Sequence, residues 1–351
     1  MPVTALTGKL KASGARIAEY HGAGTASRFD DLPSEFAALT SDCGIFDLGW
    51  RAKLLLTGAD CQKWLNGMVT NNVRDLAVGR GIYNFLLNAQ GHILGDMYLY
   101  NRGDHFLLDT DVSQAAKMRE LLEHFIIMDD VEIRDAMDRL TAVGILGPHS
   151  RQVLAAAGVA SPTNEPLQVQ DSVWGGAGIT VAATEHGGLE IWCAHEHAPK
   201  LWDALVAAGA IPVGTEALEM WRIANGIPQY GQDIRERDLP QETGQMHALN
   251  FSKGCYVGQE IVERIRSRGA VHRHFTGFQT EGPAPAPGTK LQANGKDVGE
   301  ITSVAALPTG RTVALGYVRK EAGSPGTVIT SGDTKVRISD LPFAEEPALK
   351  L

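Results

Sequence analysis

The chain has few cysteines and no apolar run long enough to cross a membrane. Its cysteines, Cys43, Cys61, Cys193 and Cys255, lie far apart and form no Cys-x-x-Cys pair. Such spacing encodes neither a zinc knuckle nor a self-contained iron–sulfur cluster site. No stretch approaches the roughly 20 apolar residues that span a bilayer, and the continuous apolar segment of a signal peptide is missing. We therefore expect a cytoplasmic protein without disulfides or membrane contacts.

An excess of positive charge is also missing. The sequence carries 32 Lys and Arg against 41 Asp and Glu, a formal net charge of −9. It therefore offers no general attraction for nucleic acid or anionic membranes. Apolar residues make up 44% and charged residues 21%, an ordinary globular composition. With 351 residues, the chain is long enough for two or three domains.

Strands and helices are expected to alternate without a strict doubly wound order. Alternating apolar residues predict strands over 51–60 and 81–110. A helix should follow, with Asp111 as its cap and with an apolar face formed by Ala115, Met118, Leu121, Leu122, Phe125 and Ile126. Further strands are predicted over 141–146 and 179–193, and helices over 150–157, 197–208 and 215–225. The pattern indicates an α+β body.

The C-terminal part changes character after a proline-rich segment at 281–288, which cannot continue a helix or a paired strand. Asn294-Gly295 is a hairpin turn signal. Short strands are predicted on either side of it and further on, over 290–293, 298–304, 312–318 and 335–339. We therefore expect residues 276–351 to form a small antiparallel β-barrel.

The segment Lys253–Glu260 places a cysteine between a glycine and an aromatic residue, with Gly-Gln-Glu beyond it. A neighbouring lysine and a helix start both favour the reactive thiolate. Lys253 would supply the charge, and a helix from Ile261 onward would place Cys255 just before its positive end. The competing interpretation is that Cys255 is a small buried apolar residue, the usual place of a free cysteine.

With these motifs in place, the chain resembles the folate-binding family of the glycine-cleavage T-protein (aminomethyltransferase) and, more closely, its YgfZ-like relatives. The resemblance implies a three-domain fold around a central channel. Its domains would be 1–140 with part of 215–275, then 141–214, then the barrel of 276–351. The matching segments are Cys43–Leu48, Leu65–Val73, Gly91–Asp96, Thr184–Ile191, Arg222–Pro228, Tyr230–Asp233 and Leu239–Glu242.

The resemblance implies tetrahydrofolate as cofactor, bound by Glu190, Arg222, Asp96, Tyr83 and Tyr230. One carboxylate can hold the amino-pyrimidinone edge of a pterin through two hydrogen bonds, and a guanidinium suits carbonyl or carboxylate oxygens. Without the family, Glu190 would be an exposed strand carboxylate and Arg222 a cation on a helix surface.

Two departures from the T-protein pattern bear on activity. The T-protein has two adjacent acids where this chain has Gly95-Asp96. Asp96 could still act as a general base, or it could be a turn residue at a strand end. Conversely, Lys253–Glu260 and the downstream Arg266–Ala270 resemble the YgfZ-like branch. By resemblance, that branch binds tetrahydrofolate and supports the assembly or repair of [4Fe–4S] enzymes, including radical enzymes that modify tRNA.

Three functions follow as hypotheses. The leading one is a folate-dependent accessory protein in iron–sulfur maturation, with Cys255, Lys253 and Asp96 as reactive residues and [4Fe–4S] client enzymes and assembly proteins as partners. The alternative is a tetrahydrofolate-dependent aminomethyltransferase of the glycine-cleavage type. The third is direct RNA binding by a basic cluster formed by Arg264, Arg266, Arg268, His272, Arg273 and His274. It ranks last because such a basic cluster is usually a solvated face.

No metal site is expected. The pairs His195/His197 and His272/His274 have strand-like spacing. Neither has an obvious third ligand, so both are interpreted as surface histidines.

Overall fold

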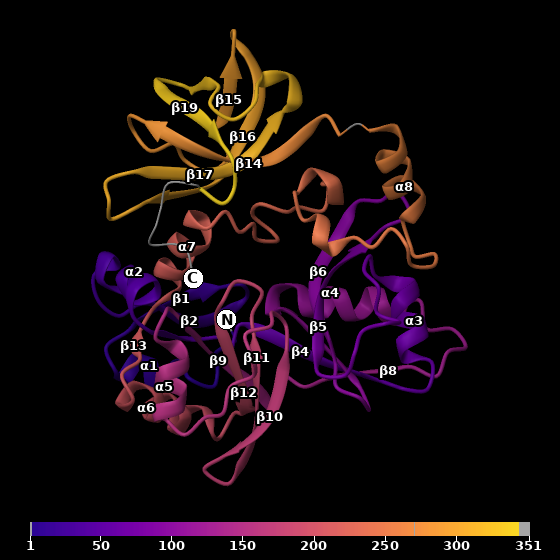
Figure 1. Ribbon diagram of the computed structural model, residues 1–351, viewed down its shortest axis with the longest axis vertical. Helices are drawn as coiled ribbons and strands as arrows, with labels where there is room; N and C mark the ends of the chain where they lie inside the picture. Colours follow the sequence, from indigo (N-terminus) through magenta and orange to yellow (C-terminus); the bar gives the residue numbers. More distant parts are fainter. Residues whose placement is uncertain (1, 270, 344–351) are drawn as a thin grey trace. The chain divides into compact units, whose positions relative to one another are not determined.

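The computed structural model describes residues 2–269 and 271–343. The described residues pack as two compact units (Figure 1): unit 1 holds 2–84 and 97–218, and unit 2 holds 85–96, 219–269 and 271–343. The predicted α+β fold with a C-terminal barrel is confirmed. The domain boundaries predicted at 140, 214 and 275 stay predictions.

Unit 1 contains a six-stranded sheet in which only β13 runs parallel to its neighbour. Its apolar core is formed by alternate strand residues such as Val143, Ile145 and Ile191, together with Leu201 and Leu205 of helix α6. The strand order is β10 (Val169–Trp174), β11 (Ala177–Ala183), β12 (Leu189–Ala194), β9 (Leu140–Leu146), β3 (Gly44–Asp47) and β13 (Ile211–Pro212). The helices of this part are α1 (Thr7–Ala12), α2 (Leu32–Ser41), α5 (Ser150–Ala156) and α6 (Ala198–Ala207).

A second sheet has five strands, and the outer part of its β5–β6 hairpin belongs to unit 2. Its strand order is β5 (Arg80–Leu87), β6 (Ile93–Asn101), β7 (Phe106–Asp111), β4 (Arg51–Thr57) and β8 (Glu132–Asp135), accompanied by α3 (Cys61–Met68) and α4 (Val112–Glu123). A separate hairpin joins β1 (Arg16–Tyr20) and β2 (Ala23–Arg28). Within unit 1, Tyr100 and Leu107 of the five-stranded sheet pack with Ala142, Ala182 and Trp192 of the six-stranded sheet.

Unit 2 contains the barrel, a closed ring of six antiparallel strands at the yellow end of the chain in Figure 1. Residues such as Phe278, Leu291, Ile301 and Ile338 fill it. The order is β14 (Arg273–Glu281), β17 (Thr312–Arg319), β16 (Lys296–Ala306), β15 (Lys290–Ala293), β18 (Val328–Ser331) and β19 (Thr334–Ser339), which pairs again with β14. The other helices are α7 (Thr215–Ala224), which spans the boundary between the units, and α8 (Gln259–Arg268) in unit 2.

Some local expectations are corrected. Helix α4 ends at Glu123, so Phe125 and Ile126 are not on its face. Asp111 holds the N-cap position but its carboxylate caps no backbone amide, because it pairs with Arg51 and His21 instead. The barrel starts at Arg273, and its strands β14 and β18 were not foreseen. Residues 344–351 of the predicted barrel, and Ala270 of the Arg266–Ala270 motif, lie outside the described residues.

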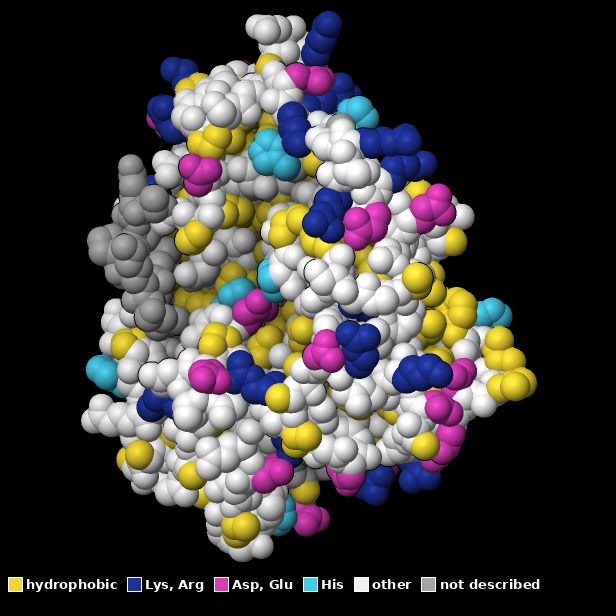
Figure 2. All heavy atoms as spheres, turned by 45° about the vertical axis from the view of Figure 1, so that its right-hand side comes forward, with side chains coloured by type: hydrophobic (Ala, Val, Ile, Leu, Met, Phe, Trp, Pro, Cys, Tyr) yellow, Lys and Arg dark blue, Asp and Glu magenta, His cyan; other side chains and the backbone are white. Residues whose placement is uncertain are grey.

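The surface carries both signs of charge, and acidic and basic side chains are interspersed over the face shown in Figure 2. None of the helices in the described ranges has the length and apolarity that a membrane crossing requires.

Candidate functional site

Unit 1 holds a buried row of ion pairs between strands β4 and β7. The register sets Arg51 opposite Asp111 and Lys53 opposite Asp109. Lys53 is fully buried, and its Nζ lies 2.8 Å from Oδ2 of Asp109. Nε of Arg51 donates to the other oxygen of Asp109 at 2.9 Å. Two cations and two carboxylates therefore neutralise one another inside the unit, as buried charges must.

Glu190 stands next to this row. It is on the same face of β12 as Trp192, two residues along, and Nε1 of Trp192 donates to its Oε2 at 2.8 Å. Burial raises the pKa of the Glu190 carboxyl, and the charge of Asp109 adds to this effect, while Lys53 acts against it. Glu190 nevertheless keeps part of its surface accessible. A carboxylate that is largely removed from water but still partly exposed can accept hydrogen bonds from a ligand.

An aromatic row leads to Glu190. The ring centroids of Tyr83 and Tyr98 are 5.0 Å apart, those of Tyr98 and Tyr100 are 6.4 Å apart, and Tyr100 meets Trp192 edge-on at 4.9 Å. The hydroxyl of Tyr98 donates to Oε2 of Glu185 at 3.1 Å. Flat aromatic rings beside a half-buried carboxylate are suited to a planar heteroaromatic ligand with N–H donors on one edge.

Of the predicted folate-binding residues, Tyr83 and Glu190 lie in this part of unit 1. The partners Lys53, Asp109, Tyr98 and Tyr100 were not assigned to the site from the sequence. The spacing of Tyr98 and Tyr100, two residues apart in one strand, was the available signal, because it places both rings on one face. The match between Lys53 and Asp109 depends on strand register, which the sequence does not display.

Arg222, in unit 2, is held by protein groups on several sides. Its guanidinium donates to Glu219 at 2.7 and 2.8 Å, to Asp233 at 2.7 Å and to the hydroxyl of Ser303 at 3.1 Å. A fourth acceptor, the carbonyl of Ile227, lies at 3.1 Å. Arg222 thus joins helix α7 to the loop after it and to the barrel. Its predicted role in folate binding stays a prediction, and a ligand would have to compete with these bonds.

Tyr230 and Asp96 lie in the same part of unit 2. The hydroxyl of Tyr230 donates to the carbonyl of Leu94 at 2.7 Å. Burial raises the pKa of the Tyr230 phenol, and the negative charges of Glu236 and Asp96 raise it further. The roles of Asp96 as a base and of Tyr230 as a folate ligand stay predictions.

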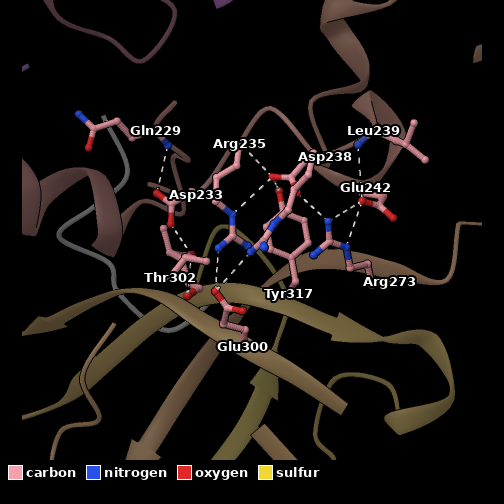
Figure 3. Close-up of polar contacts among 12 residues, drawn as sticks. Gln229, Asp233, Arg235, Asp238, Leu239, Glu242, Arg273, Glu300, Thr302 and Tyr317 are labelled. Carbon is pink, nitrogen blue, oxygen red and sulfur yellow. Dashed lines mark hydrogen bonds and ion pairs between the residues drawn. The ribbon is translucent and has the colours of Figure 1, made fainter. Parts of the chain in front are cut away.

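A polar network fixes the loop around 229–242 on the barrel (Figure 3). Asp238 is fully buried, and its Oδ1 lies 2.6 Å from Nη2 of Arg273, which also contacts Glu242 at 2.9 Å. The ring of Tyr317 has the guanidinium of Arg273 at 4.6 Å and that of Arg235 at 5.9 Å. Arg273 therefore does not belong to a solvated basic face, as the sequence had indicated, but to this internal network.

The segment around Cys255 shows a sharp contrast in burial. Cys255 is exposed, whereas Cys43, Cys61 and Cys193 are buried, so the interpretation of Cys255 as a buried apolar residue is wrong. Lys253 is buried, its Nζ lies 4.9 Å from the centre of the Tyr256 ring, and burial lowers its pKa to about 7. Gly258, with φ of 83°, precedes α8, so the thiol stands just before a helix as predicted.

Two family models cover most of the chain. The GCVT N-terminal domain matches residues 6–253, and the glycine cleavage T-protein C-terminal barrel domain matches residues 273–344. The chain belongs to the glycine-cleavage T-protein family.

Relatives of similar length support this membership. An aminomethyltransferase of Rubrobacter xylanophilus is 30% identical over 95% of this chain and 91% of its own length. An aminomethyltransferase of Halothermothrix orenii is 28% identical over 91% of this chain and 92% of its own length. The glycine cleavage system aminomethyltransferase T of Bartonella henselae superposes with a TM-score of 0.90 at 20% identity, covering 98% of both chains. This last likeness shows that the chain has the T-protein fold.

The grouping of metal-ligating side chains can be stated for the described part of the chain. Within residues 2–269 and 271–343, no three His, Cys, Asp or Glu side chains are grouped so that they could hold a metal ion. Neither histidine pair is therefore part of a three-ligand group of this kind in the described ranges.

Proposed function

We propose that this member of the T-protein family binds tetrahydrofolate and that Glu190 is the acceptor for the pterin. The observation that carries the proposal is the half-buried carboxylate of Glu190 at the end of the aromatic row. A pterin is flat and carries an amino group and a ring N–H side by side, which one carboxylate can bind with two charge-assisted hydrogen bonds.

The surrounding residues fit this ligand. Trp192 and Tyr100 offer apolar ring surface, and the hydrogen bond from Trp192 fixes the orientation of the Glu190 side chain. Lys53 is neutralised by Asp109 and acts to lower the pKa of Glu190, which favours the ionised acceptor. When bound, tetrahydrofolate would supply the nitrogen atoms that accept a one-carbon unit.

Binding is tested by titrating the purified chain with tetrahydrofolate under anaerobic conditions and following calorimetric heat. Glu190→Gln keeps the shape but removes the charge, so affinity should fall at least tenfold, about 1.4 kcal/mol or more. Glu165→Gln, which changes an exposed acid that pairs with Arg80, is the matched control and should bind as the native chain does. Equal affinities for Glu190→Gln and the control would refute the assignment.

The use that the chain makes of folate is proposed from its relatives. Those compared above are named aminomethyltransferases, which favours transfer of an aminomethyl-derived one-carbon unit to tetrahydrofolate, with Asp96 as the general base. The purified chain, given an aminomethyl-lipoyl carrier protein and tetrahydrofolate, should then form methylenetetrahydrofolate and release ammonia and the dihydrolipoyl carrier. Asp96→Asn should lower the rate by about 10²-fold or more, the usual contribution of a general base. No product with a chain that still binds folate would exclude the transferase.

A second function is proposed on a separate observation, the exposed thiol of Cys255 in the Lys253–Glu260 motif. It is the YgfZ-like role, in which the folate-bound chain supports assembly or repair of [4Fe–4S] enzymes and Cys255 meets a cluster, a persulfide or a client thiol. Exposure is what such an encounter requires.

The second function is tested in the host after deletion of the gene. Complementation uses the native chain, Cys255→Ser, or Cys193→Ser as a control at a buried thiol, with a [4Fe–4S] enzyme activity as readout. Loss on deletion that the native chain and Cys193→Ser restore, but Cys255→Ser does not, supports the role. Full restoration by Cys255→Ser would remove it and leave one-carbon transfer as the function to pursue.

A further inference from the structure

The segment just after helix α4 exposes an unusual run of apolar side chains. Phe125 is 40% exposed, Ile127 is 82% exposed and Met128 is 93% exposed. The other large apolar residues that are exposed in the described ranges are scattered singly along the chain. Isolated exposed residues need no explanation, but a contiguous apolar projection indicates an interaction site. We call residues 125–128 the apolar tip.

The apolar tip is held in place at both ends. Nε1 of Trp64 in α3 donates to the carbonyl of Phe125 at 3.2 Å. Beyond the tip, the amide of Asp130 donates to Oδ2 of Asp60 at 2.9 Å, and Oδ2 of Asp130 accepts from the amide of Ala59 at 3.1 Å. These bonds fix the base of the loop while Ile127 and Met128 project. A preformed projection loses little conformational entropy when it enters a pocket.

Glycine at position 58 makes this attachment possible. A Cβ there would lie 2.0 Å from the carbonyl oxygen of Asp130, and its φ is +116°. Only glycine accepts both the backbone angle and the close approach. The fold therefore brings the two loops together tightly beneath a surface that remains apolar.

Uncompensated carboxylates surround the tip. Asp60, Asp129 and Asp130 form no ion pair with a cation in the described ranges, whereas the nearby Glu123 and Glu132 are paired with Arg119 and Arg134. In Figure 2, hydrophobic side chains project at the right-hand edge, with acidic and basic side chains nearby. The surface thus combines an apolar centre with a negative rim, the arrangement of a protein interface with a desolvated anchor.

We propose that the apolar tip docks into an apolar pocket of a partner protein whose rim carries lysine or arginine. The negative rim selects this occupant. An anionic membrane surface would repel Asp129 and Asp130. A two-fold contact with a second copy would bring the same carboxylates face to face, in a chain that already has a net charge of −9. A basic-rimmed pocket alone satisfies both the apolar and the charged parts of the surface.

The test uses the full chain carrying p-benzoylphenylalanine in place of Ile127, or of Val173 as control, expressed in its host and irradiated. Val173 is 71% exposed and is also in unit 1. We expect one dominant protein adduct at position 127 and none at 173. Mass spectrometry should place the cross-link in an apolar segment bordered by Lys or Arg. Asp129→Lys should reduce the adduct at least fivefold.

The cross-linked protein is then purified and titrated against the native chain. Ile127→Ser should weaken binding at least tenfold and Val173→Ser less than twofold, while both variants keep the native melting temperature because each side chain is exposed. Adducts mainly to lipid or to a second copy, equal adducts at both positions, no adduct, or an adduct unaffected by Asp129→Lys would each overturn the proposal. Folate titration of the same variants should be unchanged, which separates this surface from the folate site.

Discussion

Trp192 and Glu190 face the same side of strand β12, and the indole N–H of Trp192 donates to the Glu190 carboxylate at 2.8 Å. The bond orients the proposed pterin acceptor, and burial raises the pKa of that acceptor. The protonation state of Glu190 should therefore decide ligand affinity.

Folate binding should weaken as the pH falls. The loss of affinity should begin at a higher pH than it would for a glutamate with an ordinary pKa. The ionised Glu190 can accept two hydrogen bonds from the pterin, and the protonated form accepts fewer. Because the pKa of Glu190 is raised, protonation occurs at a higher pH than for an ordinary glutamate. Dissociation constants measured between pH 5 and 8 check the expectation. Glu190→Gln should show a flatter profile than the native chain, and identical profiles would contradict it.

Breaking the buried pair of Lys53 and Asp109 should destabilise unit 1, because it leaves a buried charge without its partner. Lys53→Met leaves Asp109 buried with Arg51 as its remaining cation, so the free energy of unfolding should fall by about 3 kcal/mol. Urea denaturation measures it. Lys53→Met combined with Asp109→Leu should recover part of the loss, because an apolar pair needs no charge compensation. A single variant as stable as the native chain would show that the pair contributes nothing.

Lys253 should make stability depend on alkaline pH. Burial lowers its folded pKa to about 7, below the usual value of about 10.4 in the unfolded chain. Between these values the unfolded state binds more protons, so the free energy of unfolding should rise with pH from about 7 to about 10. Lys253→Met should remove this slope, and Lys335→Met, at an exposed lysine of the same unit, should keep it. Denaturant titrations at pH 7, 8 and 9 provide the comparison.

Glu300 should contribute to stability that is lost in acid. Burial acts to raise the pKa of its carboxyl, but hydrogen bonds from Lys290 and Arg235 outweigh this and lower the pKa to about 2. The contribution is complete above the unfolded pKa of about 4.3 and disappears as the pH falls toward 2. The free energy of unfolding of Glu300→Gln, measured by denaturant titration, should therefore be closer to that of the native chain at pH 2.5 than at pH 6. An equal difference at both pH values would be inconsistent with the ion pair.

Cys255 should be the one thiol that reacts rapidly in the folded protein. Burial raises the pKa of Cys61 and Cys193 to about 12 and also raises that of Cys43, whereas Cys255 is exposed. Ellman's reagent should label one thiol per native chain and all four after denaturation. Cys255→Ser should abolish the fast phase. Fast labelling of the Cys255→Ser variant would mean that another thiol is accessible to the reagent in the folded protein.

Local sequence patterns were sufficient to predict the class of fold, many of the helices and strands, and the family. Period-two alternation and the Asn294-Gly295 turn fixed the barrel strands β15 and β16, and glycines near 209 and 226 ended helices α6 and α7 close to where the structure ends them. These features are local, so neighbouring residues are sufficient to specify them. The family motifs also pointed to Glu190.

The pairing of charges, in contrast, became visible only in the folded chain. Strand register paired Lys53 with Asp109, and folding of the loop onto the barrel took Arg273 out of a supposed surface cluster and placed it on Asp238. It also buried Lys253 while leaving Cys255 exposed two residues away. Such outcomes depend on contacts between residues far apart in the chain, where burial and pairing set the energy of a charge, and no local pattern encodes them.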